Sequence, residues 1–171
     1  MFFLNPKRRE LKTWGQKVKY YLQWPLIRLG LWLGFEHIDY SYHSGYPGRL
    51  KIGKGCSTVN TLFNTNSGTI TVGDHTIFGY QCMAITGQHR FYQGVRSKLH
   101  ANSPIKEVPD EGQDIKIGTG CWIGSGAIIL GGVTIGDHVI IGAGSVVLKD
   151  IPTGCFAMGI PAQVIWYHNK G

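Results

Sequence analysis

A repeat of six residues is the feature of this sequence that most restricts what it can fold into. From Ile117 the chain reads IGTGCW, IGSGAI, ILGGVT, IGDHVI, IGAGSV and VLKDIP, so an aliphatic residue begins every unit. The pattern also occurs earlier, as IGKGCS from Ile52, VGDHTI from Val72 and FGYQCM from Phe78. Neither the period of a helix nor the alternation of a single strand produces this spacing. It indicates a solenoid in which each unit is one structural repeat.

Six residues are enough for one short strand and one tight turn. Glycine supplies 25 of the 171 residues, about 15% against an ordinary share of ~7%, and it often occupies the second place of a unit. We expect glycine there because turns need backbone dihedrals that other residues avoid, and we expect the aliphatic residue to point inward. Three units per coil would make a triangular prism. The predicted fold class is therefore an all-β solenoid.

The net charge of +7 is concentrated at the N-terminus. Residues 1–34 contain seven basic residues and one acidic residue, a net charge of +6, which leaves +1 for residues 35–171. The body of the chain lacks the basic stripe and the aromatic platforms of a nucleic-acid-binding protein. We therefore expect no nucleic acid partner.

The N-terminal residues 1–34 are predicted to form a basic amphipathic helical segment that precedes the solenoid domain of residues 35–171. Asn5 and Pro6 have the form of a helix start, and apolar residues then recur at helical spacing to about residue 23. Pro25 ends or kinks this helix, and a second short apolar piece follows over 26–33. The segment either contacts an anionic membrane surface weakly or caps the end of the solenoid core.

The four cysteines, Cys56, Cys82, Cys121 and Cys155, are far apart in the sequence. They form no CxxC pair and no Cys/His spacing typical of a metal site. We expect free thiols in a reducing cytosol, no metal, and no transmembrane helix, because charged residues and a proline interrupt the longest apolar run.

The run from Ile117 to Ile165, which ends in GIPAQVI, resembles the C-terminal half of the hexapeptide-repeat acyltransferases. The resemblance covers about residues 50–166 and is closest to sugar O-acetyltransferases of the galactoside, maltose and surface-polysaccharide type. It implies a left-handed parallel β-helix, acetyl-CoA as the acyl donor, and a hydroxyl of a sugar or polysaccharide precursor as the acceptor. It also implies a homotrimer in which each active site is shared between two chains.

The six-residue pattern lapses from about 88 to 114, in a polar segment that contains two prolines and two histidines, His89 and His100. An excursion of this length from a solenoid is typical of a functional loop. Acetyl transfer needs a base that takes the proton of the acceptor, and imidazole suits that role. In the resembling enzymes one histidine follows a Thr-Gly pair, and here Thr86 and Gly87 precede His89 with one intervening residue. His89 is therefore the predicted base, and His100 is the second candidate.

The resemblance also implies which residues contact the two substrates. Ser125 and Ala143 would bind the pantetheine and the thioester, while Leu148 and Lys149 would lie nearer the adenosine end. Trp122 would shape the coenzyme slot or pack between neighbouring subunits. Asn64 would face the acceptor and the developing oxyanion, or would only hydrogen-bond along the turn of its own coil.

Three other functions compete with this one. A zinc-dependent γ-type carbonic anhydrase needs two histidines five residues apart, and no pair among histidines 37, 43, 75, 89, 100, 138 and 168 has that spacing. An N-acetyltransferase acting on an amino sugar nucleotide stays open, because a histidine base serves an amine as well as a hydroxyl. A non-enzymatic β-helix scaffold also stays open, although it would not require the excursion or the GIPAQVI ending.

Overall fold

The structure, a computed structural model, describes residues 41–46 and 48–168, together with Pro25, Arg28, Leu29 and Trp32. The chain divides into two compact units, residues 1–38 and 39–171, and the second unit holds the continuous described structure. The helices predicted over 6–23 and 26–33 lie outside the described residues, apart from Arg28, Leu29 and Trp32, which are helical, as is Pro25 between the two ranges. No helix in the described part of the chain has the length and apolarity needed to cross a bilayer.

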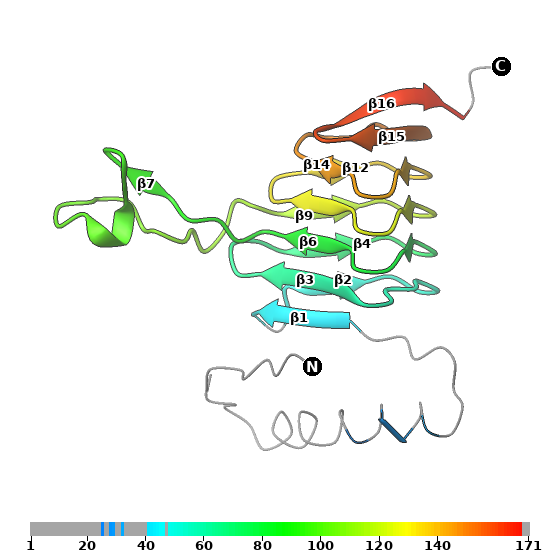
Figure 1. Cartoon of the computed structure of the whole chain (residues 1–171), viewed down its shortest axis with the longest axis horizontal. Helices are drawn as coiled ribbons and strands as arrows, with labels where there is room; N and C mark the ends of the chain where they lie inside the picture. The colour runs from blue at the N-terminus through cyan, green and yellow to red at the C-terminus, as the bar shows by residue number, and fades with distance from the viewer. Residues whose placement is uncertain (1–24, 26–27, 30–31, 33–40, 47, 169–171) are drawn as a thin grey trace. The chain divides into compact units, whose positions relative to one another are not determined.

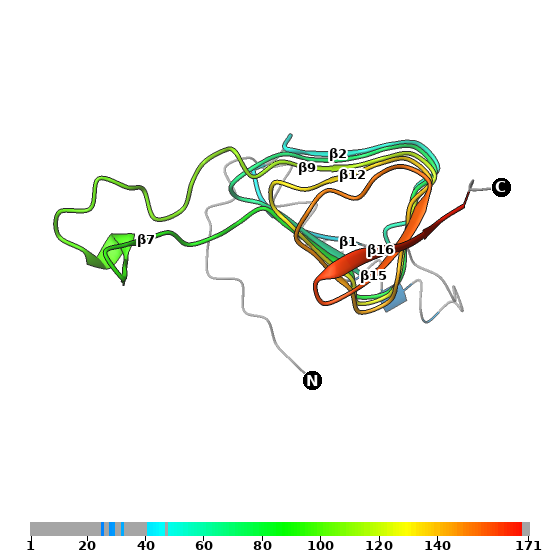
Figure 2. The same cartoon turned by 90° about the horizontal axis from the view of Figure 1, so that it is seen from above.

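The second unit is a solenoid with three faces, each a sheet that runs along its length (Figures 1 and 2). Strands within the three sheets are parallel, except that β15 and β16 pair antiparallel. Sheet A contains β1 (Ser41–Gly45), β3 (Thr61–Thr65), β6 (Met83–Ile85), β11 (Ile128–Leu130) and β14 (Val146–Val147). Sheet B contains β2 (Leu50–Ile52), β4 (Ile70–Val72), β9 (Ile115–Ile117) and β12 (Thr134–Ile135). Sheet C contains β5 (Ile77–Phe78), β10 (Trp122–Ile123), β13 (Ile140–Ile141), β15 (Cys155–Gly159) and β16 (Ala162–Tyr167).

The inside of the prism is filled by the aliphatic residues that begin the units. The predicted step of six is confirmed, because all six of these residues in the continuous run are buried: Ile117, Ile123, Ile129, Ile135, Ile141 and Val147. Neighbouring coils place like residues over one another, so that Ile129 pairs with Ala84 on one side and with Val147 on the other. The core is therefore a stack of layers whose spacing follows from the separation of paired strands, about 4.8 Å.

Each coil turns three corners, which join sheet A to B, B to C and C to A. At the B-to-C corner His75 and His138 have left-handed backbone with φ of 58° and 55°, and both side chains are exposed. Glycine occupies the same place in the adjoining coil. A Cβ on Gly120 would collide with the histidine ring, because it would lie only 2.7 Å from His138 Nδ1. The backbone N–H of Thr119 donates to Asp137 Oδ1 at 2.7 Å across the same two coils. These Asp-His turns therefore join coils and have no catalytic partner among the described residues.

The excursion leaves the solenoid after β6, at the A-to-B corner, and returns at β9. It contains the antiparallel pair β7 (Phe91–Tyr92) and β8 (Val95–Arg96), followed by the 3-10 helix η1 (Ser97–Leu99). Figures 1 and 2 both show it projecting away from the prism. Its returning limb is attached to the first coil, because Arg49 Nη1 donates to the carbonyl of Asp110 at 2.5 Å.

Candidate active site

His89 lies where the excursion begins, and a carboxylate from the returning limb holds its ring. His89 Nδ1 is 2.8 Å from Glu107 Oε1, and the backbone N–H of Arg90 donates to the carbonyl of Glu107 at 2.7 Å. The side chain of His89 is 60% exposed, whereas that of Glu107 is only 10% exposed. A carboxylate at this distance favours the tautomer with its proton on Nδ1, which leaves the lone pair on Nε2. The exposed ring can therefore accept a proton from a bound molecule.

Arg96 contacts the same carboxylate oxygen. Its Nε is 3.2 Å from Glu107 Oε1, so this oxygen forms an ion pair with Arg96 and a hydrogen bond with His89. The second oxygen, Glu107 Oε2, is buried and has no hydrogen-bond partner among the described residues. Sequence analysis missed Glu107 and Arg96, because nothing in the sequence distinguishes Glu107 from the other acidic residues of the returning limb.

His100 has contacts within the excursion only, as far as the described residues show. Its ring packs edge-on against Tyr92 with 4.9 Å between centroids, and its Nδ1 accepts from the backbone N–H of Asn102 at 3.3 Å. The structure does not bring His100 to the Glu107 carboxylate. Of the two predicted candidates for the base, His89 alone has a carboxylate at its ring in this part of the chain.

Asn64 lies beside the segment that leads to His89. The carbonyl of Asn64 accepts from the N–H and the hydroxyl of Thr86 at 3.0 and 2.8 Å. A Cβ on Gly87 would lie 3.0 Å from Asn64 Oδ1, so the glycine permits this close approach. Oδ1 also accepts from the backbone N–H of Asn66 at 3.1 Å, while no hydrogen bond of Nδ2 to a described residue is present. The side chain thus closes a local turn and keeps a donor free.

Ser125 and Ala143 lie at a different corner, where sheet C turns into sheet A. They occupy successive coils, joined by a bond from the Gly144 N–H to the Ser125 carbonyl at 2.9 Å. A Cβ on Gly124 would lie 2.6 Å from the backbone nitrogen of Ala143, so the coils are in close contact here. One strand of sheet A, three residues or about 10 Å long, separates this corner from the corner that carries His89. Within one chain the structure therefore does not bring Ser125 or Ala143 to His89.

Leu148 and Lys149 are exposed at the same corner as His89, beyond the end of β14. Two strand spacings separate β6 from β14 in sheet A, which corresponds to about 10 Å along the solenoid. Trp122 lies on the outer face of sheet C, 57% exposed, in register with Ile77 and Ile140. The five predicted coenzyme contacts thus lie along two corners and one face rather than in one cluster.

The outer faces of the three sheets differ in polarity. The in-register outer residues of sheet B are polar, namely Lys51, Thr71, Lys116 and Thr134. Sheet A carries one apolar row, namely Tyr42, Leu62, Met83, Ile128 and Val146, beside a second row of Ser44, Asn64, Ile85 and Leu130. Those of sheet C are also apolar, namely Ile77, Trp122, Ile140, Phe156 and Trp166. Two of the three faces therefore carry a row of apolar side chains that the described residues of the solenoid leave uncovered.

The ionisable groups outside the excursion do not form a metal centre. Within residues 41–46 and 48–168 no three side chains of histidine, cysteine, aspartate or glutamate are grouped so that they could hold an ion. All four cysteines are free thiols, and burial raises the pKa of Cys82, Cys121 and Cys155. These thiols are therefore protonated residues of the core near neutral pH.

Comparison with known proteins gives the same fold and one family. Residues 114–149 match the family described as bacterial transferase hexapeptide (six repeats). The chain is 36% identical to galactoside O-acetyltransferase of Escherichia coli (strain K12) over 121 residues, 70% of this chain and 55% of that protein. It is 31% identical to "Putative colanic acid biosynthesis acetyltransferase WcaF" of the same strain over 157 residues, 90% of this chain and 79% of the relative.

A solved structure of galactoside acetyltransferase in complex with coenzyme A is also similar, with a TM-score of 0.56 and 29% identity. The match covers 75% of this chain and 64% of that one. The chain spans about half the length of the galactoside O-acetyltransferase that it matches. The six-residue repeat, the three-sided coil and the WcaF match over most of both chains show that this protein belongs to the hexapeptide-repeat transferases, with the left-handed parallel β-helix that its sequence predicts.

Proposed function

We propose that this protein transfers an acetyl group from acetyl-CoA to a hydroxyl of a sugar or polysaccharide precursor, with His89 as the general base. The observation that carries the proposal is the pairing of His89 Nδ1 with the Glu107 carboxylate at the start of the excursion. The relatives support the choice of reaction, because their names describe acetyltransferases that act on galactosides or in colanic acid biosynthesis.

The pairing suggests how the proton moves. Nε2 of His89 takes the hydroxyl proton while the acceptor oxygen attacks the thioester carbonyl, and the imidazolium that forms is stabilised by Glu107. The tetrahedral intermediate then collapses: its carbon–sulfur bond breaks, and the leaving thiolate takes the proton from Nε2. The free Nδ2 of Asn64 would donate to the acceptor or to the oxyanion. The base is thus neutral again at the end of each turnover.

The coenzyme would be held by residues of the solenoid outside the excursion. The small side chains of Ser125 and Ala143 leave the backbone of their corner open to a pantetheine arm, which bonds through amides. Leu148 supplies an exposed apolar surface and Lys149 a cation without an ion-pair partner among the described residues. Trp122 would border the slot or pack against another subunit. These roles rest on the sequence resemblance and fit the exposure of the side chains.

We propose further that the protein is a homotrimer whose active sites form between chains. Two observations support this: the uncovered apolar faces of sheets A and C, and the separation of Ser125 and Ala143 from His89 within one chain. A neighbouring copy could cover such a face and bring its own corner residues to the base. Light scattering at micromolar concentration tests the assembly, and a fully active monomer would refute it.

Residues 1–34, with their net charge of +6, are proposed to contact an anionic membrane surface weakly. Attraction of this kind is worth about 1 kcal/mol per cation near the surface and weakens with salt. Co-sedimentation with vesicles that contain phosphatidylglycerol, at low and high salt, measures it. No binding even at low salt would leave the segment as a cap on the solenoid.

The central experiment measures release of coenzyme A from acetyl-CoA with a panel of sugars, amino sugars and nucleotide sugars. His89→Ala should lower kcat by about 10²–10⁴-fold and leave coenzyme A affinity within a few-fold. His100→Ala is the matched control, because it removes an imidazole from the same excursion, and it should cost far less. A His89→Ala variant that keeps more than about a tenth of kcat, while His100→Ala loses activity, would show that the base is misassigned.

A further inference from the structure

Most N–H groups of the Arg96 guanidinium are not bonded to its carboxylate partner, Glu107. Its ion pair with Glu107 runs from Nε to the oxygen that His89 also uses, while Glu107 Oε2 has no hydrogen-bond partner among the described residues. An arginine that served only to neutralise this carboxylate would be expected to bond both oxygens in the usual two-point geometry. The side chain is 46% exposed, and its two terminal amino groups have no partner in the described part of the chain. Four N–H donors therefore remain available beside the base.

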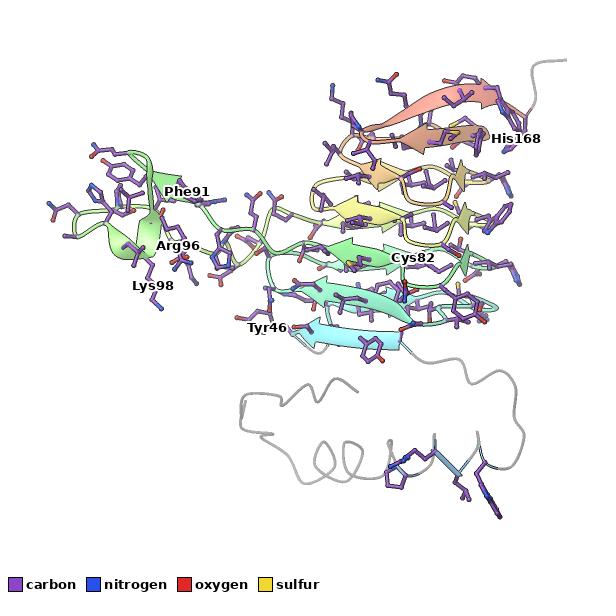
Figure 3. All side chains as sticks on the ribbon, viewed as in Figure 1. Tyr46, Cys82, Phe91, Arg96, Lys98 and His168 are labelled. Carbon is purple, nitrogen blue, oxygen red and sulfur yellow. The ribbon has the colours of Figure 1, made fainter. Side chains whose placement is uncertain are left out.

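The charges of the excursion are divided between its two limbs. Residues 88–100 contain Arg90, Arg96 and Lys98 and no acidic residue, while all four carboxylates lie in the returning limb, residues 101–114. Arg90 and Lys98 are exposed and have no ion pair with a described residue. Figure 3 shows Arg96 and Lys98 on the lower side of the excursion in that view. The limb that carries His89 is thus positively charged and accessible.

We propose that Arg96 binds an anionic group of the acceptor, so that the preferred acceptor is a sugar carrying a phosphate or a carboxylate rather than a neutral sugar. This inference rests on the proposed function. A guanidinium with two free amino groups matches the paired oxygens of both anions, and its contact with Glu107 fixes it relative to His89. Binding the anion there would fix the acceptor relative to Nε2 of the base. Arg90 and Lys98 add attraction without a fixed contact.

The test compares kcat/KM for matched acceptors in the full-length protein. A methyl glycoside is the neutral acceptor, and the 1-phosphate and the methyl glycosiduronate of the same sugar series are the anionic ones. The parent enzyme should favour at least one anionic acceptor. Arg96→Gln should lower the ratio of anionic to neutral kcat/KM roughly 10–100-fold, as expected for loss of a charge-assisted bond, and Arg96→Lys should lower it less. The acceptor with the larger loss identifies phosphate or carboxylate as the group that is bound.

The ratio of anionic to neutral kcat/KM distinguishes an anion-binding Arg96 from one that only positions Glu107. If Arg96 only oriented Glu107, its loss would slow all acceptors equally and leave the ratio unchanged, which would refute the proposal. Lys51→Gln, which removes a cation from the polar outer face of sheet B, should leave the ratio as in the parent. Calorimetric binding of the 1-phosphate gives a second readout. If the parent enzyme turns over neutral and anionic sugars equally well, and if parent and Arg96→Gln bind the 1-phosphate with equal affinity, this inference is refuted. The proposed function is left intact by that result. Absence of turnover with every acceptor refutes the proposed function, and Arg96-dependent phosphate binding would still uphold the anion site.

Discussion

Replacing Glu107 by glutamine tests whether its charge, rather than its shape, supports the base. Glutamine keeps an oxygen that can accept from His89 Nδ1, but it removes the negative charge that would face the imidazolium in the proposed transition state. The two atoms are 2.8 Å apart in the structure, and the neutral substitute has nearly the same size. The variant should therefore bind both substrates normally and turn over more slowly.

The size of the effect follows from how well water screens the pair. Unit charges about 4 Å apart attract by about 1 kcal/mol in water and by about 4 kcal/mol at an effective dielectric of about 20. His89 is 60% exposed and Glu107 is 10% exposed, which places the pair nearer the aqueous limit. Arg96 on the same oxygen offsets part of the charge. We expect about 1–2 kcal/mol, or a loss of roughly 5–30-fold in kcat.

The assay is coenzyme A release at saturating donor and acceptor, with KM measured for both. Glu107→Ala should cost more than Glu107→Gln, because it also removes the acceptor that selects the Nδ1–H tautomer, and nitrogen NMR of the His89 ring reports that change directly. Glu111→Gln is the matched control, since Glu111 is an exposed carboxylate of the same limb. A kcat within about twofold of the parent in both Glu107 variants would refute a role for this carboxylate.

Three further predictions concern the assembly and the stability of the solenoid. Trp122→Glu places a charge on the apolar outer face of sheet C and should convert the proposed trimer to smaller species in light scattering, whereas Lys51→Glu on the polar face of sheet B should not. Ile129→Ala removes a side chain that is 0% exposed and should lower the free energy of unfolding by about 2–5 kcal/mol in urea titrations; a loss below about 1 kcal/mol would contradict the layered core. Burial raises the pKa of Cys82 and Cys121 above the ordinary value of a thiol, about 9, so the unfolded chain loses these protons first. The unfolding free energy should therefore fall as pH rises above about 9. This fall should be smaller in Cys82→Ala, measured by urea unfolding between about pH 8 and 10, and an equal fall would contradict it.

The parts of this protein that repeat could be predicted from the sequence because their constraints are local. A buried aliphatic residue at every sixth position and a turn between strands require only nearest neighbours along the solenoid, so Ile123, Ile129 and Ile135 are buried as their spacing predicts. The break in the pattern likewise locates the excursion and its two histidines. Neither prediction depends on which distant residues meet.

The residues that form the candidate site are brought together by contacts that the six-residue repeat does not specify. Glu107 reaches His89 across 18 positions because two irregular limbs pair through the Arg90 N–H and the Glu107 carbonyl. Nothing in the sequence distinguishes the four acidic residues of that limb from one another, and only the fold of the excursion brings one of them to His89. The same fold brings Arg96 to that carboxylate.

The arrangement of the predicted coenzyme-binding residues along the prism is also a tertiary property. The sequence determined the repeat, the inward residues and the candidate base, because burial and turn formation recur with every unit. The tertiary structure decided that Ser125 and Ala143 occupy one corner of the coil and His89 another, because a corner is defined only once the three sheets have closed into a prism. It also decided that the outward residues form two apolar faces and one polar face, since strand pairing between coils aligns side chains that are far apart in the sequence.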